Sequence, residues 1–266
     1  MAGMMTSLLL LLLAGVTVGR VVDLQKRIIG GHTCAATERL YHVKVISNFQ
    51  GEVYHCGGSL INKQWILTAA HCVKMGVESV TVNLGVNGDG QRETCVIDDI
   101  RRKTTLLDTK YVPHDIVLLK LPESVTGYAF VDLPECGTPP QIGQTVEIAG
   151  HGATQVKRDG TRGNFPDSNT LQCAYTNVAA CTQGDLNSGF YSTPETLFCF
   201  KDKNVDISHG DSGGGVVFEN KIYGVISFVG DDQVAFQHPA GAVKVCEYID
   251  WIQEMMGTVW TCTTCG

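Results

Sequence analysis

The sequence predicts an all-β protein, mainly because it is rich in turns and poor in long helical patterns. Thirty of its 266 residues are glycine, a composition that suits many tight turns. Short runs of β-prone residues separated by turn-forming residues recur along the chain. Examples are residues 41–46, 65–69, 79–84, 116–121, 144–149 and 222–228. Such spacing is typical of small antiparallel barrels.

The chain divides into two β-rich units followed by one helix. Leu133-Pro134-Glu135 and a Gly/Pro-rich stretch as far as Gly143 mark the boundary between residues 28–133 and 134–245. The periodicity then changes, because apolar residues in 246–256 recur three or four positions apart, which predicts an amphipathic helix. Residues 257–266 form a tail with two cysteines.

Residues 1–19 have the features of a secretory signal peptide. Leucines fill positions 8–13, and Thr17-Val18-Gly19 offers small residues for cleavage. The apolar stretch is too short to span a bilayer comfortably, so a membrane anchor is the weaker interpretation. We expect a secreted, extracellular protein with no membrane partner.

Charge and cysteine content narrow the class further. The net charge of −7 disfavours a general nucleic-acid binder. Eleven cysteines in a chain with a predicted signal peptide indicate disulfides.

One glycine-rich motif and two distant residues suggest nucleophilic catalysis. Ser212 lies in Gly-Asp-Ser-Gly-Gly at 210–214, where flanking glycines allow a tight turn with an exposed hydroxyl. A serine needs a base, which must itself be oriented. His71 follows Leu-Thr-Ala-Ala, and Asp115 begins an apolar run. A serine, a histidine and an aspartate can form a catalytic triad, and the order His, Asp, Ser along the chain is one of its known orders.

On these motifs the chain resembles the trypsin/chymotrypsin-type serine proteases over roughly residues 28–256. The resemblance implies two packed six-stranded antiparallel barrels and a C-terminal α-helix, with the active site between the barrels. Ser212 would be the nucleophile, His71 the general base and Asp115 the residue that orients it. The N–H groups of Gly210 and Ser212 would form the oxyanion hole. We expect no metal and no cofactor.

The resemblance also implies activation by proteolysis. Residues 20–27 would be a propeptide that ends in Lys26-Arg27. An activating protease that cuts after Arg27 would free the amino group of Ile28, which would pair with Asp211 in the interior. Alternatively, the basic pair is only a charged linker.

Specificity is where the sequence departs from the family pattern. Asp206 lies six residues before Ser212, the spacing of the acid that selects Arg or Lys in trypsins. Ser227 matches a serine that supports the buried acid. However, Phe228 replaces a tryptophan, and Ala240 stands where a glycine lines the pocket. Because of Asp206, cleavage after Arg or Lys is the first expectation. The alternative is specificity for small or aromatic side chains, in which case Asp206 would only be a loop acid.

The family implies four disulfides: Cys34–Cys173, Cys56–Cys72, Cys136–Cys246 and Cys181–Cys199. Cys95, Cys262 and Cys265 are left over. We expect Cys95 to bridge one of the two tail cysteines. A metal or redox Cys-X-X-Cys site in the tail is the alternative.

Two functions from different classes fit these observations. The first is a secreted endopeptidase with polypeptide substrates and protein inhibitors. The second is a catalytically weak homologue that binds a partner through its cleft. The intact set of His71, Asp115 and Ser212 favours the first, and the altered pocket leaves room for the second.

Overall fold

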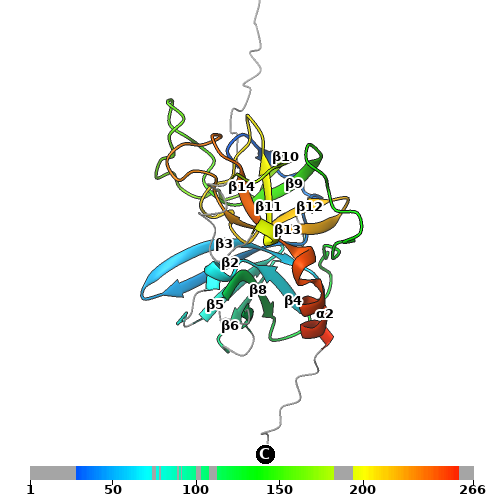
Figure 1. The fold of residues 1–266 in the computed structure, drawn as a ribbon. Coiled ribbons are helices and arrows are strands. Elements are labelled where there is room, and N and C mark those ends of the chain that lie inside the picture. Colours follow the sequence, from blue (N-terminus) through cyan, green and yellow to red (C-terminus); the bar gives the residue numbers. More distant parts are fainter. Residues whose placement is uncertain are drawn as a thin grey trace, which may run out of the picture.

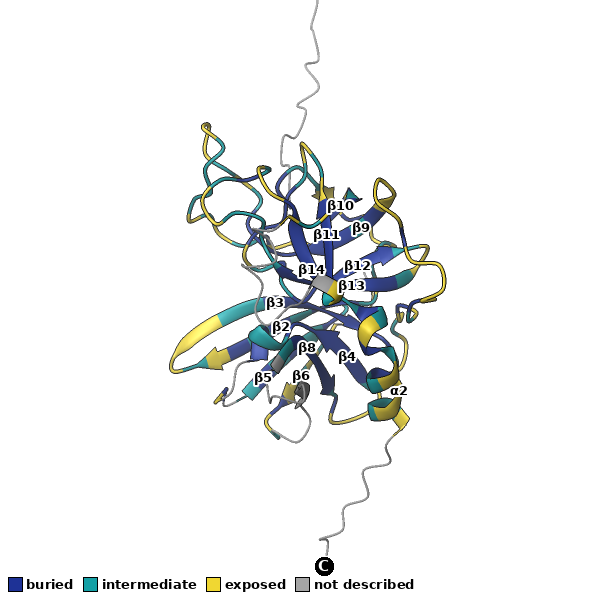
Figure 2. Cartoon of the chain, viewed as in Figure 1, coloured by how far each residue is buried: buried dark blue, intermediate teal, exposed yellow. Residues whose placement is uncertain are grey.

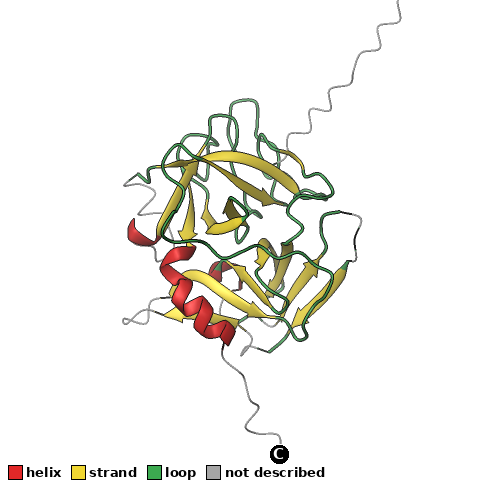
Figure 3. Cartoon of the chain, turned by 90° about the vertical axis from the view of Figure 1, so that its right-hand side faces the viewer, coloured by secondary structure: helices red, strands yellow, loops and turns green. Residues whose placement is uncertain are grey.

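The computed structural model describes residues 28–73, 76–77, 79–88, 90, 92–99, 103–107, 113–182 and 194–257. Its strands form two sheets, one above the other in Figure 1, and a helix lies along one side (Figure 3). This arrangement confirms the predicted all-β class with a C-terminal helix.

The first sheet is built from the N-terminal half of the chain. All its pairings are antiparallel, and the longest runs from His42↔Ser59 to Phe49↔Glu52. In spatial order its strands are β6 (Glu93–Ile97), β5 (Ser79–Leu84), β2 (His42–Phe49), β3 (Glu52–Leu60), β4 (Trp65–Thr68), β8 (Pro113–Lys120) and β7 (Lys103–Leu107). Within the described ranges no pairing joins β6 to β7, so this seven-stranded sheet is a partly open barrel rather than the expected closed six-stranded one.

The second sheet closes on itself, because β9 pairs with both β10 and β12. Its ring has the expected six strands, and β1 (His32–Thr33) adds a short seventh that pairs with Gln172 and Cys173 of β10. In order around the ring the strands are β10 (Gln172–Ala179), β11 (Leu197–Lys201), β14 (Ala240–Lys244), β13 (Lys221–Phe228), β12 (Gly215–Phe218) and β9 (Thr145–Gly150).

Each sheet encloses a core of branched apolar side chains. Burial alternates along β5, as expected for a strand with one face on the core. Strands β4, β13 and β14 are almost wholly buried, the tip of the β2–β3 hairpin is exposed, and many other exposed residues lie in the connecting loops (Figure 2). Ile28, the first described residue, has no exposed surface and belongs to the core of the second barrel.

The last described segment crosses back to the first barrel. A short 3₁₀ turn, η4 (Val245–Tyr248), leads into α2 (Ile249–Gly257). Ile252 of α2 is fully buried in the core of the first barrel, and Nδ2 of Asn62 donates a hydrogen bond to Sδ of Met256. Within the described residues, no helix is long and apolar enough to cross a membrane.

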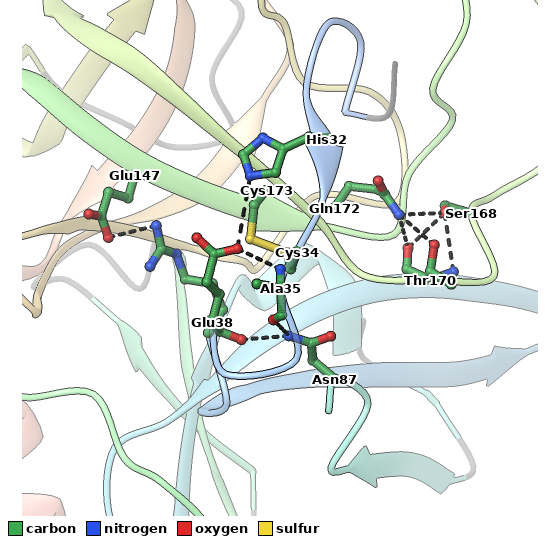
Figure 4. The surroundings of a disulfide bond; sticks show 11 residues. His32, Cys34, Ala35, Glu38, Asn87, Glu147, Ser168, Thr170, Gln172 and Cys173 are labelled. Carbon is green, nitrogen blue, oxygen red and sulfur yellow. Dashed lines mark hydrogen bonds and ion pairs between the residues drawn. A yellow bond between two sulfur atoms is a disulfide. The ribbon is translucent and has the colours of Figure 1, made fainter. Parts of the chain in front are cut away.

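The structure contains four disulfides with the pairings that the resemblance implies: Cys34–Cys173, Cys56–Cys72, Cys136–Cys246 and Cys181–Cys199. Figure 4 shows how the first of them fastens the N-terminal segment to β10. In the same view, Asn87 of the first barrel donates to the carbonyl oxygens of Ala35 and Glu38 at 2.8 and 2.6 Å. The segment is thereby tied to both barrels.

Cys95 is a partly buried cysteine on β6 that has no disulfide partner among the described residues. Burial raises the pKa of its thiol to about 11. Its two expected partners, Cys262 and Cys265, lie outside the described residues, as do the signal peptide at 1–19 and the propeptide at 20–27. The expected bridge to the tail stays a prediction.

Candidate active site

Pairing between β4 and β8 brings two of the expected site residues together. The chain leaves β4 and forms η1 (Ala70–Val73), which carries His71. Asp115 lies near the start of β8, which pairs with β4 through Thr68↔Val117. His71 and Asp115 are thus neighbours on the first barrel although they are 44 positions apart in the sequence.

The carboxylate of Asp115 accepts hydrogen bonds from three groups. Nδ1 of His71 lies 2.9 Å from Oδ2 and 3.0 Å from Oδ1 of Asp115, and the backbone N–H of His71 donates to Oδ1 at 2.8 Å. The hydroxyl of Ser227, on the second barrel, donates to Oδ2. The side chain of Asp115 is 2% exposed and that of His71 is 22% exposed. The acid is therefore enclosed and bonded, while the histidine reaches solvent.

Ser212 lies in the loop between β11 and β12, facing a cavity between the barrels. The cavity holds about 370 Å³ and is lined by His71, Gly210 and Ser212, together with residues of β3 that include His55. The backbone holds the loop in place, because the N–H of Gly57 donates to the carbonyl oxygen of Ser212 at 2.7 Å. The structure thus brings Ser212 and His71 to the same cavity.

Two backbone donors beside Ser212 are free. Within the described residues, neither the N–H of Gly210 nor that of Ser212 donates to a protein acceptor. Gly213 has a φ of +82°, and a β-carbon there would overlap Oγ1 of Thr68 and the carbonyl oxygen of Gly57. Only glycine fits this turn without strain, and the turn is what leaves the two N–H groups unpaired.

Asp211 is fully buried directly behind this turn. Its two carboxylate oxygens each accept a backbone hydrogen bond of 2.8 Å, one from Gly152 and one from Ser208. Burial is the largest effect and raises the pKa of Asp211 to about 7. No cationic side chain among the described residues forms an ion pair with it.

Asp206 is also buried, and the structure supplies it with a cationic partner that the sequence analysis missed. Nη2 of Arg162 lies 2.6 Å from Oδ2 of Asp206. The backbone N–H groups of Phe236 and Ile207 donate to the same carboxylate at 2.8 and 2.9 Å. The expected preference for Arg or Lys assumed a free carboxylate, so it has to compete with this pair.

The structure does not bring the other predicted pocket residues together with Asp206 in one cavity: Asp206, Phe228 and Ala240 are not among the residues that line the cavity of Ser212. Ala240 pairs with Phe200 on β11, and both are buried in the second core. The ring of Phe228 lies directly over Gly241, where any β-carbon would overlap it. His209 is exposed and lines the cavity of Ser212, and its Nε2 lies 4.0 Å from Oδ1 of Asp232.

Another feature that sequence reasoning missed is a histidine–carboxylate pair in the same cavity. Nδ1 of His55 lies 2.6 Å from Oδ2 of Asp167, and both side chains are about one third exposed. The pair joins β3 of the first barrel to a loop of the second. No motif in the sequence connects these residues, because they are 112 positions apart.

One cluster has the geometry of a metal site without its chemistry. Ligand-type atoms of Cys56, His71 and Cys72 lie within 4.8 Å of one another. The two cysteines form a disulfide, so neither offers the thiolate that a metal ion requires.

Comparisons with known proteins identify the family and agree with this fold. The sequence profile of the trypsin family matches residues 28–252. Serine protease 1 of dog (Canis lupus familiaris) is 31% identical over 258 residues, covering 94% of this chain and 98% of its own. Trypsin I-P1 of chicken (Gallus gallus) is 31% identical, with 96% and 100% covered. Human (Homo sapiens) kallikrein-8 is 29% identical, with 95% of each chain covered.

The chain belongs to the trypsin family of serine endopeptidases, which are hydrolases. Proteases of this family act on polypeptide substrates, are commonly inhibited by protein inhibitors, and are typically secreted as zymogens.

Proposed function

We propose that the protein is a secreted serine endopeptidase that uses His71, Asp115 and Ser212 as a catalytic triad. The observation that carries this proposal is the shared cavity. It brings together Ser212, a histidine held by a buried carboxylate, and the free N–H groups of Gly210 and Ser212. These are the parts that acyl transfer to a serine requires.

In the first half of the reaction, Oγ of Ser212 attacks the carbonyl carbon of the scissile peptide bond. Nε2 of His71 takes the hydroxyl proton, and Asp115 stabilises the resulting imidazolium through Nδ1. The carbonyl oxygen becomes an oxyanion that accepts hydrogen bonds from the N–H groups of Gly210 and Ser212. Loss of one such donor costs about 3 kcal/mol in the barrier. His71 then gives its proton to the leaving amine, and an acyl-enzyme remains.

In the second half, a water molecule replaces the amine. His71 takes a proton from this water as the oxygen attacks the acyl carbon, and returns the proton to Oγ of Ser212 when the ester breaks. Ser227 acts indirectly. Its hydroxyl donates a hydrogen bond to Asp115 and so fixes the carboxylate that orients the imidazole of His71. Peptide acid and free enzyme are the products.

We further propose that the protein is a zymogen, secreted through residues 1–19 and activated by a second protease that cuts after Arg27. Two observations support this. Asp211 is buried without a cationic partner among the described residues, so a new ammonium group at Ile28 would supply its missing charge. Ile28 is β-branched and has a φ of +41°, a strained conformation. Cleavage removes the carbonyl carbon that defines this angle.

Within this function, the Arg162–Asp206 pair favours an uncharged side chain before the scissile bond over the Arg or Lys expected from Asp206 alone. A non-tryptic specificity is therefore the form of the proposal that the site supports best.

Labelling by a serine-directed phosphonate tests the function without knowledge of the substrate. The protein cut after Arg27 should form one covalent adduct, located on Ser212 by peptide mapping. Ser212→Ala should form none, and His71→Ala should react at least about a hundredfold more slowly. A folded, cut protein that forms no adduct would point instead to a homologue without catalysis.

A further inference from the structure

The side chain of Arg162 is buried in the second barrel with every guanidinium nitrogen bonded. Nη2 donates to Asp206 at 2.6 Å. Nη1 donates to the carbonyl oxygen of Ile207, and Nε to that of Asp231, both at 2.7 Å. Only 8% of the Arg162 side chain is exposed. An arginine this enclosed has a fixed position rather than a solvated one.

The carboxylate of Asp206 accepts hydrogen bonds from three groups. Oδ2 accepts from Arg162 and from the N–H of Phe236, and Oδ1 accepts from the N–H of Ile207. Burial acts to raise the pKa of Asp206 and the guanidinium acts to lower it. An ion pair with its hydrogen bonds satisfied is a stable arrangement for a buried charge, whereas either partner alone is costly.

The backbone around Arg162 fixes the side chain. Its N–H donates to the carbonyl oxygen of Gln233 at 2.7 Å, and Ala235 donates to Gly160 at 3.1 Å. Thr161 forms a β-bridge with Val234. The loop that carries Arg162 is thus hydrogen-bonded to the segment 231–236. This segment supplies two groups that bond to the Arg162–Asp206 pair, the carbonyl oxygen of Asp231 and the N–H of Phe236.

We propose that Arg162 is a specificity-determining residue that occupies the acidic end of the specificity pocket in place of a substrate guanidinium. The protease then selects uncharged side chains before the scissile bond. This inference rests on the proposed function, since it concerns the same site. Asp206 is the residue that the sequence assigns to substrate Arg or Lys, yet its carboxylate already accepts hydrogen bonds from three groups of the protein, one of them a guanidinium.

The physical reason is competition. A substrate arginine would have to displace Arg162 and break its three hydrogen bonds, or enter beside a second buried cation. Like charges in a buried site are strongly unfavourable. An uncharged side chain meets neither obstacle. Arg162 itself attracts no substrate acid, because Asp206 neutralises it.

Benzamidine, a small amidinium compound, tests the inference without catalysis. In the Ser212→Ala background, calorimetry should detect no binding at millimolar concentration. Arg162→Gln should bind benzamidine with a Kd at least about tenfold below the highest concentration at which the parent shows no binding, and adding Asp206→Asn should abolish that binding. Arg158→Gln is the matched control, because Arg158 is exposed on the same loop and its loss should change nothing.

Kinetics on the activated protein provides the second reading. Matched peptides with Arg, Leu, Ala or Asp before the scissile bond give the ratio of kcat/KM values. Arg162→Gln should raise the Arg-to-Leu ratio at least about tenfold over the parent, and Asp206→Asn should reverse the gain.

Benzamidine binding by the parent that Asp206→Asn removes would overturn the inference, and this result needs no Arg162 variant to fold. A parent that prefers Arg peptides, with an Arg-to-Leu ratio of kcat/KM that is unchanged in folded Arg162→Gln, would also overturn it.

Failure of the proposed function would give a different result. No peptide would be cut and no phosphonate adduct would form, while the benzamidine measurements would still report on Arg162.

Discussion

The imidazole rings of His42 and His151 lie 5.6 Å apart, centroid to centroid, where the first barrel meets the second. Both are buried, and within the described residues neither nitrogen of His42 nor Nδ1 of His151 has a hydrogen-bond partner. Burial lowers the pKa of His42 well below its usual value and that of His151 to about 4, with a smaller contribution from Lys44. Both rings are therefore neutral at pH 7.

This pair predicts a loss of stability in mild acid. The unfolded histidines bind protons below pH 6.5, but the folded ones do not, so unfolding gains protons as the pH falls from about 6.5 to about 4. For His151 the effect amounts to about 3 kcal/mol. Urea unfolding at pH 7.5 and pH 5 should show a smaller acid loss for His151→Phe than for the parent. His238→Gln, at an exposed position, is the control. Equal acid losses for His151→Phe and the parent would contradict the prediction.

In the uncut chain, the buried carboxyl group of Asp211 should make the fold less stable as the pH rises, which is the opposite of the effect of the two histidines. Because its folded pKa of about 7 lies above the usual carboxyl value, the folded state holds a proton that the unfolded state releases. Stability therefore falls as the pH rises from about 4 to 7, by about 4 kcal/mol. We expect Asp211→Asn, and cleavage after Arg27, each to flatten this dependence in urea unfolding. A slope unchanged by both would show that no new ammonium group pairs with Asp211.

Activation provides a separate prediction. Arg27→Gln should be secreted like the parent but remain almost inactive after treatment with trypsin, because the amino group of Ile28 is never freed. Edman sequencing of the parent should yield Ile-Ile-Gly-Gly at the point where activity appears. Full activity of the intact Arg27→Gln chain would refute the zymogen.

Alanine substitutions at Gly213 and Gly51 compare a turn in the active site with an ordinary tight turn. Both have positive φ, +82° and +84°, but a β-carbon at Gly51 would have no neighbour within 4 Å. Gly213→Ala should destabilise the fold by roughly 2–4 kcal/mol and abolish turnover, because the turn that frees the two N–H donors must shift. Gly51→Ala should cost about 1 kcal/mol and leave kcat/KM unchanged. Similar losses in both variants would mean that the turn at Gly213 has no special role.

The sequence was informative wherever function constrains a short motif. The motifs around His71, Asp115 and Ser212, in this order along the chain, identified the family, and the family supplied the barrels and the disulfide pairings. The open first barrel was not predicted, because closure depends on strand pairing at β6 and β7 rather than on the alternation within either strand.

The side-chain partners of the pocket could not be found in this way. Arg162 and Asp206 are 44 positions apart, and an arginine in a polar loop has the sequence features of a solvated residue. His42 and His151 have the same character: each is a lone histidine in the sequence, and only the meeting of two barrels encloses them. Pairs of residues that are distant in the sequence leave no local pattern, whether they form within one barrel or between the two.

The central claim, that Ser212, His71 and Asp115 act as one catalytic unit, is tested most directly by kinetics on single and double variants. For the protein cut after Arg27, kcat/KM on an uncharged peptide should fall by a factor of about 10⁴ or more in Ser212→Ala and in His71→Ala. The double variant should be no slower than either, because members of a triad lose their effect together. Losses that multiply in the double variant, or turnover by Ser212→Ala close to that of the parent, would contradict the account.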